Sequence, residues 1–130
     1  MYNDWTITVS FYAALHIVEY AIHETENLTF SGNPINILHT DELKDALMKK
    51  NIEIENIKQQ SQHILRKILV TENFPSISIE FNTLYNESRI ARYLHYQMGD
   101  DKVKTSTMYL EYIYNWANKS FDAKLPKIRF

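Results

Sequence analysis

The residues best suited to chemistry lie between Ser88 and His95, where the chain reads Ser-Arg-Ile-Ala-Arg-Tyr-Leu-His. This stretch places two arginines and a histidine within about two turns of one expected helix. A guanidinium stays charged and suits phosphate, and an imidazole titrates near neutrality and can transfer protons. Arg89 and His95 are therefore candidates for binding and cleaving a phosphodiester, with Arg92 as a second cation.

The same residues also have a structural interpretation. Six helical steps of about 100° place Arg89 and His95 about 120° apart around the axis, so they do not share a face. His95 falls on the apolar stripe with Ala91 and Met98, where a buried imidazole bonded to a neighbouring helix is the alternative to a catalytic one. The arginines could instead pair with Glu87 or with acids of another helix. The sequence leaves both interpretations open.

Helices must position these side chains. Apolar residues recur at steps of three and four and predict helices over about 4–23, 40–50, 54–73, 76–98 and 102–120. Two glycines and three prolines in 130 residues favour a few long helices, and residues 27–34 carry the strongest turn signal. We predict one all-α domain over residues 1–130, an antiparallel up-and-down bundle of four core helices plus one additional or extended helix.

The pattern also predicts faces and caps. On the third helix, Ile64 and Ile68 belong to the apolar face and Arg66 to the solvent face. Thr40 or Asp41 is expected to cap the second helix, since either side chain can accept hydrogen bonds from the first-turn amides.

Aromatic residues within the amphipathic patterns are expected to be packing anchors rather than base-stacking platforms: Trp5, Tyr12, Tyr93 and Trp116. His16 lies beside an apolar face and is expected in the core or an interface. Glu19 and His23 have a spacing that could ligate a metal, but two residues do not make a site, so we predict no metal and no cofactor.

Composition narrows the function classes. A net charge of -2 and a pI near 6.2 give no overall electrostatic footprint for nucleic acid, so an RNA site must be a local patch. No apolar run approaches the roughly 20 residues of a membrane span, no signal peptide is recognisable, and no cysteine is present. We expect a cytoplasmic protein without a membrane segment. Glycine-rich phosphate loops, Gly-x-Ser-x-Gly elbows and His-Glu-x-x-His motifs are missing, which excludes several enzyme classes.

Two segments resemble the HEPN superfamily of small nucleotide-associated helical domains. They are Asp4-Trp5 followed by residues 11–16, Phe-Tyr-Ala-Ala-Leu-His, and residues 81–93, with ordered Leu-Tyr, Ser-Arg and Ala-Arg-Tyr elements. The match covers about half of the chain. Residues 34–39 resemble the opening of the family's second helix, although Glu42 stands where an arginine is expected shortly after His39. The segment 51–72 is a further departure.

The resemblance implies a homodimer with a four-helix core. Many members are metal-independent endoribonucleases that use an Arg followed a few residues later by a His. Arg89 and His95, with five residues between them, fit that interval. The resemblance implies catalytic roles for this pair, and we assign Arg92 and Tyr93 to nucleic-acid binding.

The biological role is also an expectation from the resemblance. It implies RNA or a nucleotide as ligand and a place in a prokaryotic toxin-antitoxin or defence module, with a nucleotidyltransferase antitoxin as a further partner. The alternative is a catalytically inactive helical module for dimerisation or partner docking.

Overall fold

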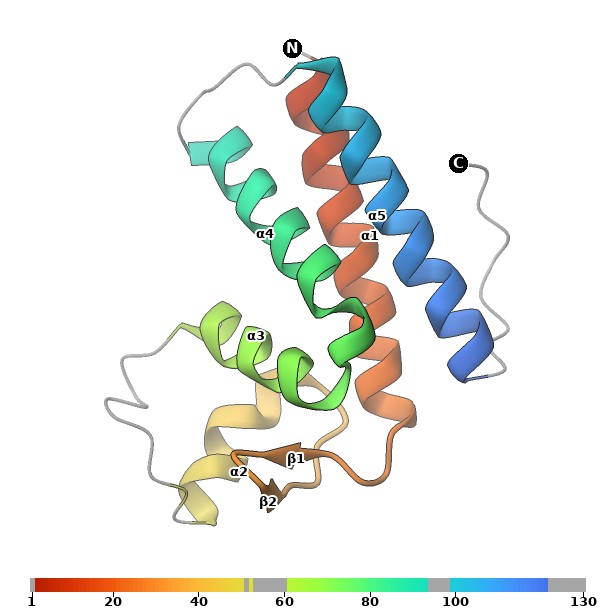
Figure 1. Ribbon diagram of the computed structural model, residues 1–130. Helices are drawn as coiled ribbons and strands as arrows, with labels where there is room; N and C mark the ends of the chain where they lie inside the picture. The colour runs from red at the N-terminus through yellow and green to blue at the C-terminus, as the bar shows by residue number, and fades with distance from the viewer. Residues whose placement is uncertain (1, 51, 53–60, 94–98, 122–130) are drawn as a thin grey trace. The chain divides into compact units, whose positions relative to one another are not determined.

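The computed structural model describes residues 2–50, 52, 61–93 and 99–121 (Figure 1). The described residues form five α-helices: α1 (Tyr2–Glu24), α2 (Leu43–Lys49), α3 (Gln62–Asn73), α4 (Ser78–Tyr93) and α5 (Asp100–Ser120). The described residues also form two short 3-10 helices, η1 (Thr40–Glu42) and η2 (Pro75–Ile77). Two short strands, β1 (Thr29–Phe30) and β2 (Asn33–Pro34), form a small hairpin. The all-α class is confirmed, whereas the four-helix bundle stays a prediction. None of the described helices is both long and apolar enough to cross a membrane.

The chain divides into two compact units. Unit 1 comprises Met1–Ile17 and Ile79–Phe130, and unit 2 comprises Val18–Ser78. The boundary falls within α1, so this helix contributes to both units. One domain over residues 1–130 stays a prediction.

Unit 1 is built from the N-terminal part of α1 together with α4 and α5. Figure 1 shows α4 running in the opposite direction to α1 and α5. Ile7 and Ala91 form a buried cluster, against which Ile90 and Val103 pack. Because these residues come from α1, α4 and α5, one apolar cluster joins all three helices.

Aromatic side chains extend this core. The Phe11 ring lies 5.9 Å from that of Phe81 and 5.6 Å from that of Tyr85, centroid to centroid, both in tilted arrangements. Such pairs stabilise a core by about 0.5–1.5 kcal/mol beyond their buried area. Of the predicted apolar stripe that contains Ala91, His95 and Met98, the position of Ala91 is confirmed, since Ala91 is buried on the same side of α4 as Phe81, Leu84 and Ser88.

One aromatic prediction was wrong, because Trp5 is 69% exposed and is not a buried packing anchor. Tyr12 is 42% exposed, yet its ring packs against that of Phe11 with centroids 5.4 Å apart. His16 is exposed, so it does not belong to the core, and its place in an interface stays a prediction. Trp116 does pack, edge to face against Phe121 with ring centroids 5.4 Å apart. The Tyr93 side chain lies outside the described residues.

In unit 2, the expected turn forms a hairpin. Thr29 pairs with Pro34 and Phe30 with Asn33. Ser31 and Gly32 both have positive φ, 50° and 78°. Left-handed conformations at both central residues twist a two-residue turn to match the strands, and glycine adopts them at no steric cost. The turn was predicted, but the pairing was not.

The C-terminal end of α3 holds this hairpin. The Glu72 carboxylate accepts hydrogen bonds from the amides of Ser31 (2.7 Å) and Gly32 (3.2 Å) and from the Thr29 hydroxyl. Asn73 exchanges two bonds with the Thr29 backbone, accepting at 2.9 Å and donating at 2.7 Å. The Thr29 hydroxyl, aided by the two amides, holds the pKa of Glu72 below its ordinary value.

Helix α3 is rotated from the predicted register. Its buried residues are Leu65, Arg66, Leu69 and Val70, whereas Ile64 and Ile68 are exposed. The assignment of Arg66 to the solvent face was therefore wrong, and the physical reason is an ion pair inside unit 2.

Candidate functional site

Arg89 lies on the exposed side of α4. Its neighbours Ser88 and Ala91 are buried, so the guanidinium projects away from the core of unit 1. Glu87, one of the acidic partners considered for the arginines, instead accepts a hydrogen bond from the Lys102 ammonium at 2.9 Å. Within the described part of the chain, no residue makes a hydrogen bond or ion pair with Arg89. This arginine is therefore available for an external anion.

The other three predicted site residues are not brought into the described geometry. Arg92 and Tyr93 lie in the last turn of α4, but their side chains are outside the described residues. His95 falls outside the described residues entirely. Pairing of Arg89 with His95 therefore stays a prediction.

A second polar cluster, which sequence reasoning missed, lies in unit 2. The Arg66 Nε lies 3.3 Å from Glu19 Oε1, and both side chains are nearly buried, at 7% and 11% exposure. Thr40 adds two bonds to the same carboxylate, from its amide to Oε2 at 3.0 Å and from its hydroxyl to Oε1. A buried charge is stable only when it is paired and hydrogen-bonded, and this arrangement meets both conditions.

Two histidines complete the cluster. His39 caps η1, since its Nδ1 accepts from the Asp41 amide at 3.0 Å, and its Nε2 faces Glu19 Oε2 at 3.5 Å. The His63 Nδ1 lies 2.9 Å from Arg66 Nη1, and because a guanidinium can only donate, this nitrogen is the acceptor. Both imidazoles therefore accept at Nδ1 in this arrangement.

The cap differs from the prediction. His39, rather than Thr40 or Asp41, is the N-cap, and it forms a capping box with Glu42. The Glu42 carboxylate accepts from the amides of Leu38 (2.6 Å) and His39 (3.3 Å). The resemblance would place an arginine at this position. Glu42 instead forms part of the cap at the start of η1.

These contacts suit a structural role. Both oxygens of Glu19 are engaged, by Arg66 and Thr40 on one side and by Thr40 and His39 on the other. A general base would need an oxygen that faces a substrate. We conclude that this cluster ties α1, η1 and α3 together within unit 2.

No metal centre emerges from the residues that the structure describes, because no group of three or more potential ligands converges there. Glu19 points into the polar cluster, whereas His23 lies 3.4 Å from Glu24, Nδ1 to Oε1. Glu19 and His23, whose spacing suggested a metal site, therefore contact different partners.

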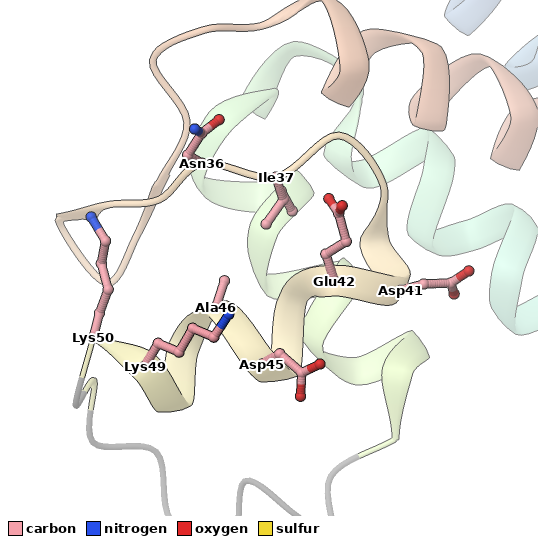
Figure 2. A pocket seen from close by; sticks show the side chains of 8 residues that line it. All are labelled: Asn36, Ile37, Asp41, Glu42, Asp45, Ala46, Lys49 and Lys50. Carbon is pink, nitrogen blue, oxygen red and sulfur yellow. The ribbon is translucent and has the colours of Figure 1, made fainter.

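A pocket of about 400 Å³ lies beside α2, and Figure 2 shows its lining side chains. Acidic and basic residues line it together with an amide and two apolar side chains: Asn36, Ile37, Asp41, Glu42, Asp45, Ala46, Lys49 and Lys50. Glu42 and Asp41 are already used by the helix start and by a bond from Gln62. Of the predicted site residues, only Arg89 has a described side chain, and it does not line this pocket.

Comparisons of the chain with protein-family models, with curated proteins and with solved structures found no match.

Proposed function

We propose that this chain is a HEPN-like cytoplasmic domain that binds or cleaves RNA or nucleotides through the exposed face of α4. The observation that carries the proposal is the Arg89 guanidinium, which is exposed and has no partner among the described residues while Lys102 occupies the adjacent Glu87. A delocalised, permanently charged group of this kind suits bidentate binding of phosphate. The sequence resemblance supports the same residue.

In the proposed mechanism no metal takes part. The RNA 2′-hydroxyl attacks the adjacent phosphorus while His95 accepts its proton, and the bond from phosphorus to the 5′-oxygen breaks. The departing oxygen takes up a proton, and Arg89 stabilises the charge on the phosphorane. Arg92 and Tyr93 would contact the neighbouring phosphate and base. Two copies in a homodimer would supply two such sets of residues.

The proposed setting is a prokaryotic toxin-antitoxin or defence module, with the chain as effector and a nucleotidyltransferase as the antitoxin partner. Sequestration by a partner would explain how a nuclease of low specificity is tolerated by its host. Release of the partner would then expose Arg89.

A second candidate is a non-enzymatic module for dimerisation or partner docking. The net charge of -2 favours this candidate, because an acidic chain attracts RNA only locally. A domain of this kind without catalytic activity would keep the packing of α1, α4 and α5 but would not cleave RNA.

The test is an RNA cleavage assay with the purified full chain in excess chelator. We expect cleavage by the wild type and loss of at least about 100-fold for Arg89→Ala and for His95→Ala, the scale of a lost electrostatic or proton-transfer contribution. Lys104→Ala is the matched control, since Lys104 is an exposed cation on α5. Equal cleavage by all variants, or none by the wild type, would contradict the enzymatic proposal.

A further inference from the structure

The pocket beside α2 lies wholly within unit 2 (Figure 2). Its lining residues come from α2, which contributes Asp45, Ala46 and Lys49, and from the segment 36–37 between β2 and η1. Its volume of about 400 Å³ falls within the range of small-molecule sites. Such sites combine an apolar surface with a few polar groups, and this pocket has both.

Two of the charged side chains that line the pocket already have structural roles. Glu42 accepts hydrogen bonds from two backbone amides in the cap of η1. Asp41 accepts one from Gln62 and lies 3.2 Å from His39, Oδ2 to Nδ1. These two carboxylates stabilise η1, so a ligand must be recognised by the other polar groups.

The remaining polar side chains of the pocket are not engaged. Asp45, Lys49 and Lys50 are exposed, and they make no ion pair with any other residue that the structure describes. The Asn36 side chain makes no hydrogen bond within the described ranges. The pocket thus offers two cations, one anion and one amide to a ligand.

The main chain beside the pocket is also unpaired. Ile35 donates its amide to the Leu28 carbonyl at 3.0 Å, after which the pairing stops. The backbone groups of Asn36 and Ile37 have no hydrogen-bond partner in the described part of the chain. Main-chain amides and carbonyls must be satisfied by protein, water or a ligand. Peptide groups satisfy them when a peptide binds along an unpaired segment.

The separation of charge along the pocket sets the length of the ligand. In Figure 2, Asp45 lies toward one end, and Asn36 and Lys50 lie toward the other. Five helical steps from Asp45 to Lys50 rise about 7.5 Å, which is close to two extended residues at about 3.3–3.6 Å each. In a free amino acid, by contrast, the ammonium and the α-carboxylate are attached to the same carbon.

We propose that this pocket binds a dipeptide with a free N-terminus and an acidic second residue. Asp45 pairs with the ammonium of the ligand, and Lys49 and Lys50 pair with its two carboxylates. Asn36 bonds to the peptide group, and Ile37 contacts a small apolar first side chain. Two lysines and one aspartate give the unengaged groups one net positive charge, and the ligand carries one net negative charge.

Solvent limits the expected affinity. The charged side chains of the pocket are exposed, and exposed ion pairs contribute little because water and salt screen them. We therefore expect a dissociation constant of about 0.1–1 mM at low salt, and weaker binding as the salt concentration is raised.

The inference does not depend on the proposed nuclease. The pocket belongs to unit 2, whereas Arg89 lies on α4 in unit 1. Failure of dipeptide binding would leave the RNA proposal as it stands, and failure of RNA cleavage would leave the pocket as it stands.

Nuclear magnetic resonance of the isotope-labelled full chain measures the binding and locates it. Titration with Ala-Glu should give saturable shifts of the Asn36 side-chain amide and of the Ala46 backbone amide. Ala-Gln lacks one carboxylate and N-acetyl-Ala-Glu lacks the ammonium, so each should bind at least about tenfold more weakly. Equal binding of the three ligands, or no shift in the pocket at about 20 mM Ala-Glu, would overturn the proposal.

Two variants assign the contacts. Asp45→Asn should remove the preference for Ala-Glu over N-acetyl-Ala-Glu, and Lys50→Gln should reduce the preference for Ala-Glu over Ala-Gln. Both side chains are exposed, so these variants should fold like the wild type. Lys67→Gln, an exposed change on α3 outside the pocket, should bind each ligand like the wild type. If both pocket variants kept the preferences of the wild type, the proposal would be overturned.

Discussion

The Arg66 guanidinium and the Glu19 carboxylate form a nearly buried ion pair, with Nε 3.3 Å from Oε1. Removing two charges from water is costly, and the pair is tolerated because Thr40 and His63 satisfy further donors and acceptors. The cost of losing one partner should therefore exceed the value of the pair itself, since the remaining charge would be buried alone.

Arg66→Met should lower the free energy of unfolding by about 3–5 kcal/mol, because Glu19 then keeps a buried charge without its cation. Urea denaturation followed by circular dichroism measures this loss. Lys67→Met, at the exposed neighbouring position, is the control and should change stability by less than about 0.5 kcal/mol. Adding Glu19→Gln to Arg66→Met should restore part of the loss. Strict additivity of the two changes would contradict the pairing.

The hydrogen bonds between Glu72 and the hairpin predict that the free energy of unfolding depends on pH. The hydrogen bonds of Glu72, first that from the Thr29 hydroxyl, lower its pKa in the folded chain. A lowered folded pKa contributes stability that is present above the unfolded value and is lost as pH falls through the folded value. Because Glu72 is exposed, we expect Glu72→Gln to cost only about 0.5–1 kcal/mol near pH 7.

The measurement is urea unfolding of wild type and Glu72→Gln between about pH 7 and about pH 3. The difference between the two chains should shrink as the pH falls. Glu26→Gln is the control, since Glu26 is an exposed carboxylate on the preceding loop. A difference that stays constant over this range would show that the carboxylate charge does not hold the hairpin.

His39 should be replaceable only by another capping residue. His39→Ala removes the acceptor for the Asp41 amide and should cost about 0.5–2 kcal/mol. His39→Asn keeps a short side-chain oxygen at the cap and should recover most of that loss. Thermal unfolding of the wild type and the two variants measures both losses. Equal losses for the two variants would mean that the contribution of His39 does not come from the cap.

Hydrophobic periodicity was sufficient to predict most helices. The starts and ends of α1 and α5 agree with the pattern to within a few residues, and α3 ends at Asn73, before Phe74-Pro75, as predicted. The break at Phe74 is local, because proline disfavours helix at the residue before it. Properties that a single segment determines were therefore predictable.

Properties that depend on contacts between distant segments could not be predicted from the sequence. The rotation of α3 follows from Arg66 meeting Glu19, which lies 47 residues earlier. A signal was present: Glu19 stands among Ile17, Val18, Ala21 and Ile22 on α1, where a carboxylate without a partner would be unfavourable. The sequence does not specify which cation pairs with the Glu19 carboxylate.

The candidate site shows the same limit. The exposure of Arg89 is consistent with its place beside the buried Ser88 in the α4 stripe. That Glu87 is engaged by Lys102 could not be predicted, because the contact joins two helices whose relative rotation depends on the whole core of unit 1. The exposure of Trp5 likewise depends on which neighbours cover α1.

Binding of RNA by Arg89 is the central claim, and fluorescence anisotropy with a labelled single-stranded RNA at low salt tests it most directly. Arg89→Ala should weaken binding by about tenfold or more, as expected for a lost charge-assisted phosphate contact, whereas Lys104→Ala should bind within about twofold of the wild type. Equal weakening by both variants, or no binding by the wild type, would contradict the account.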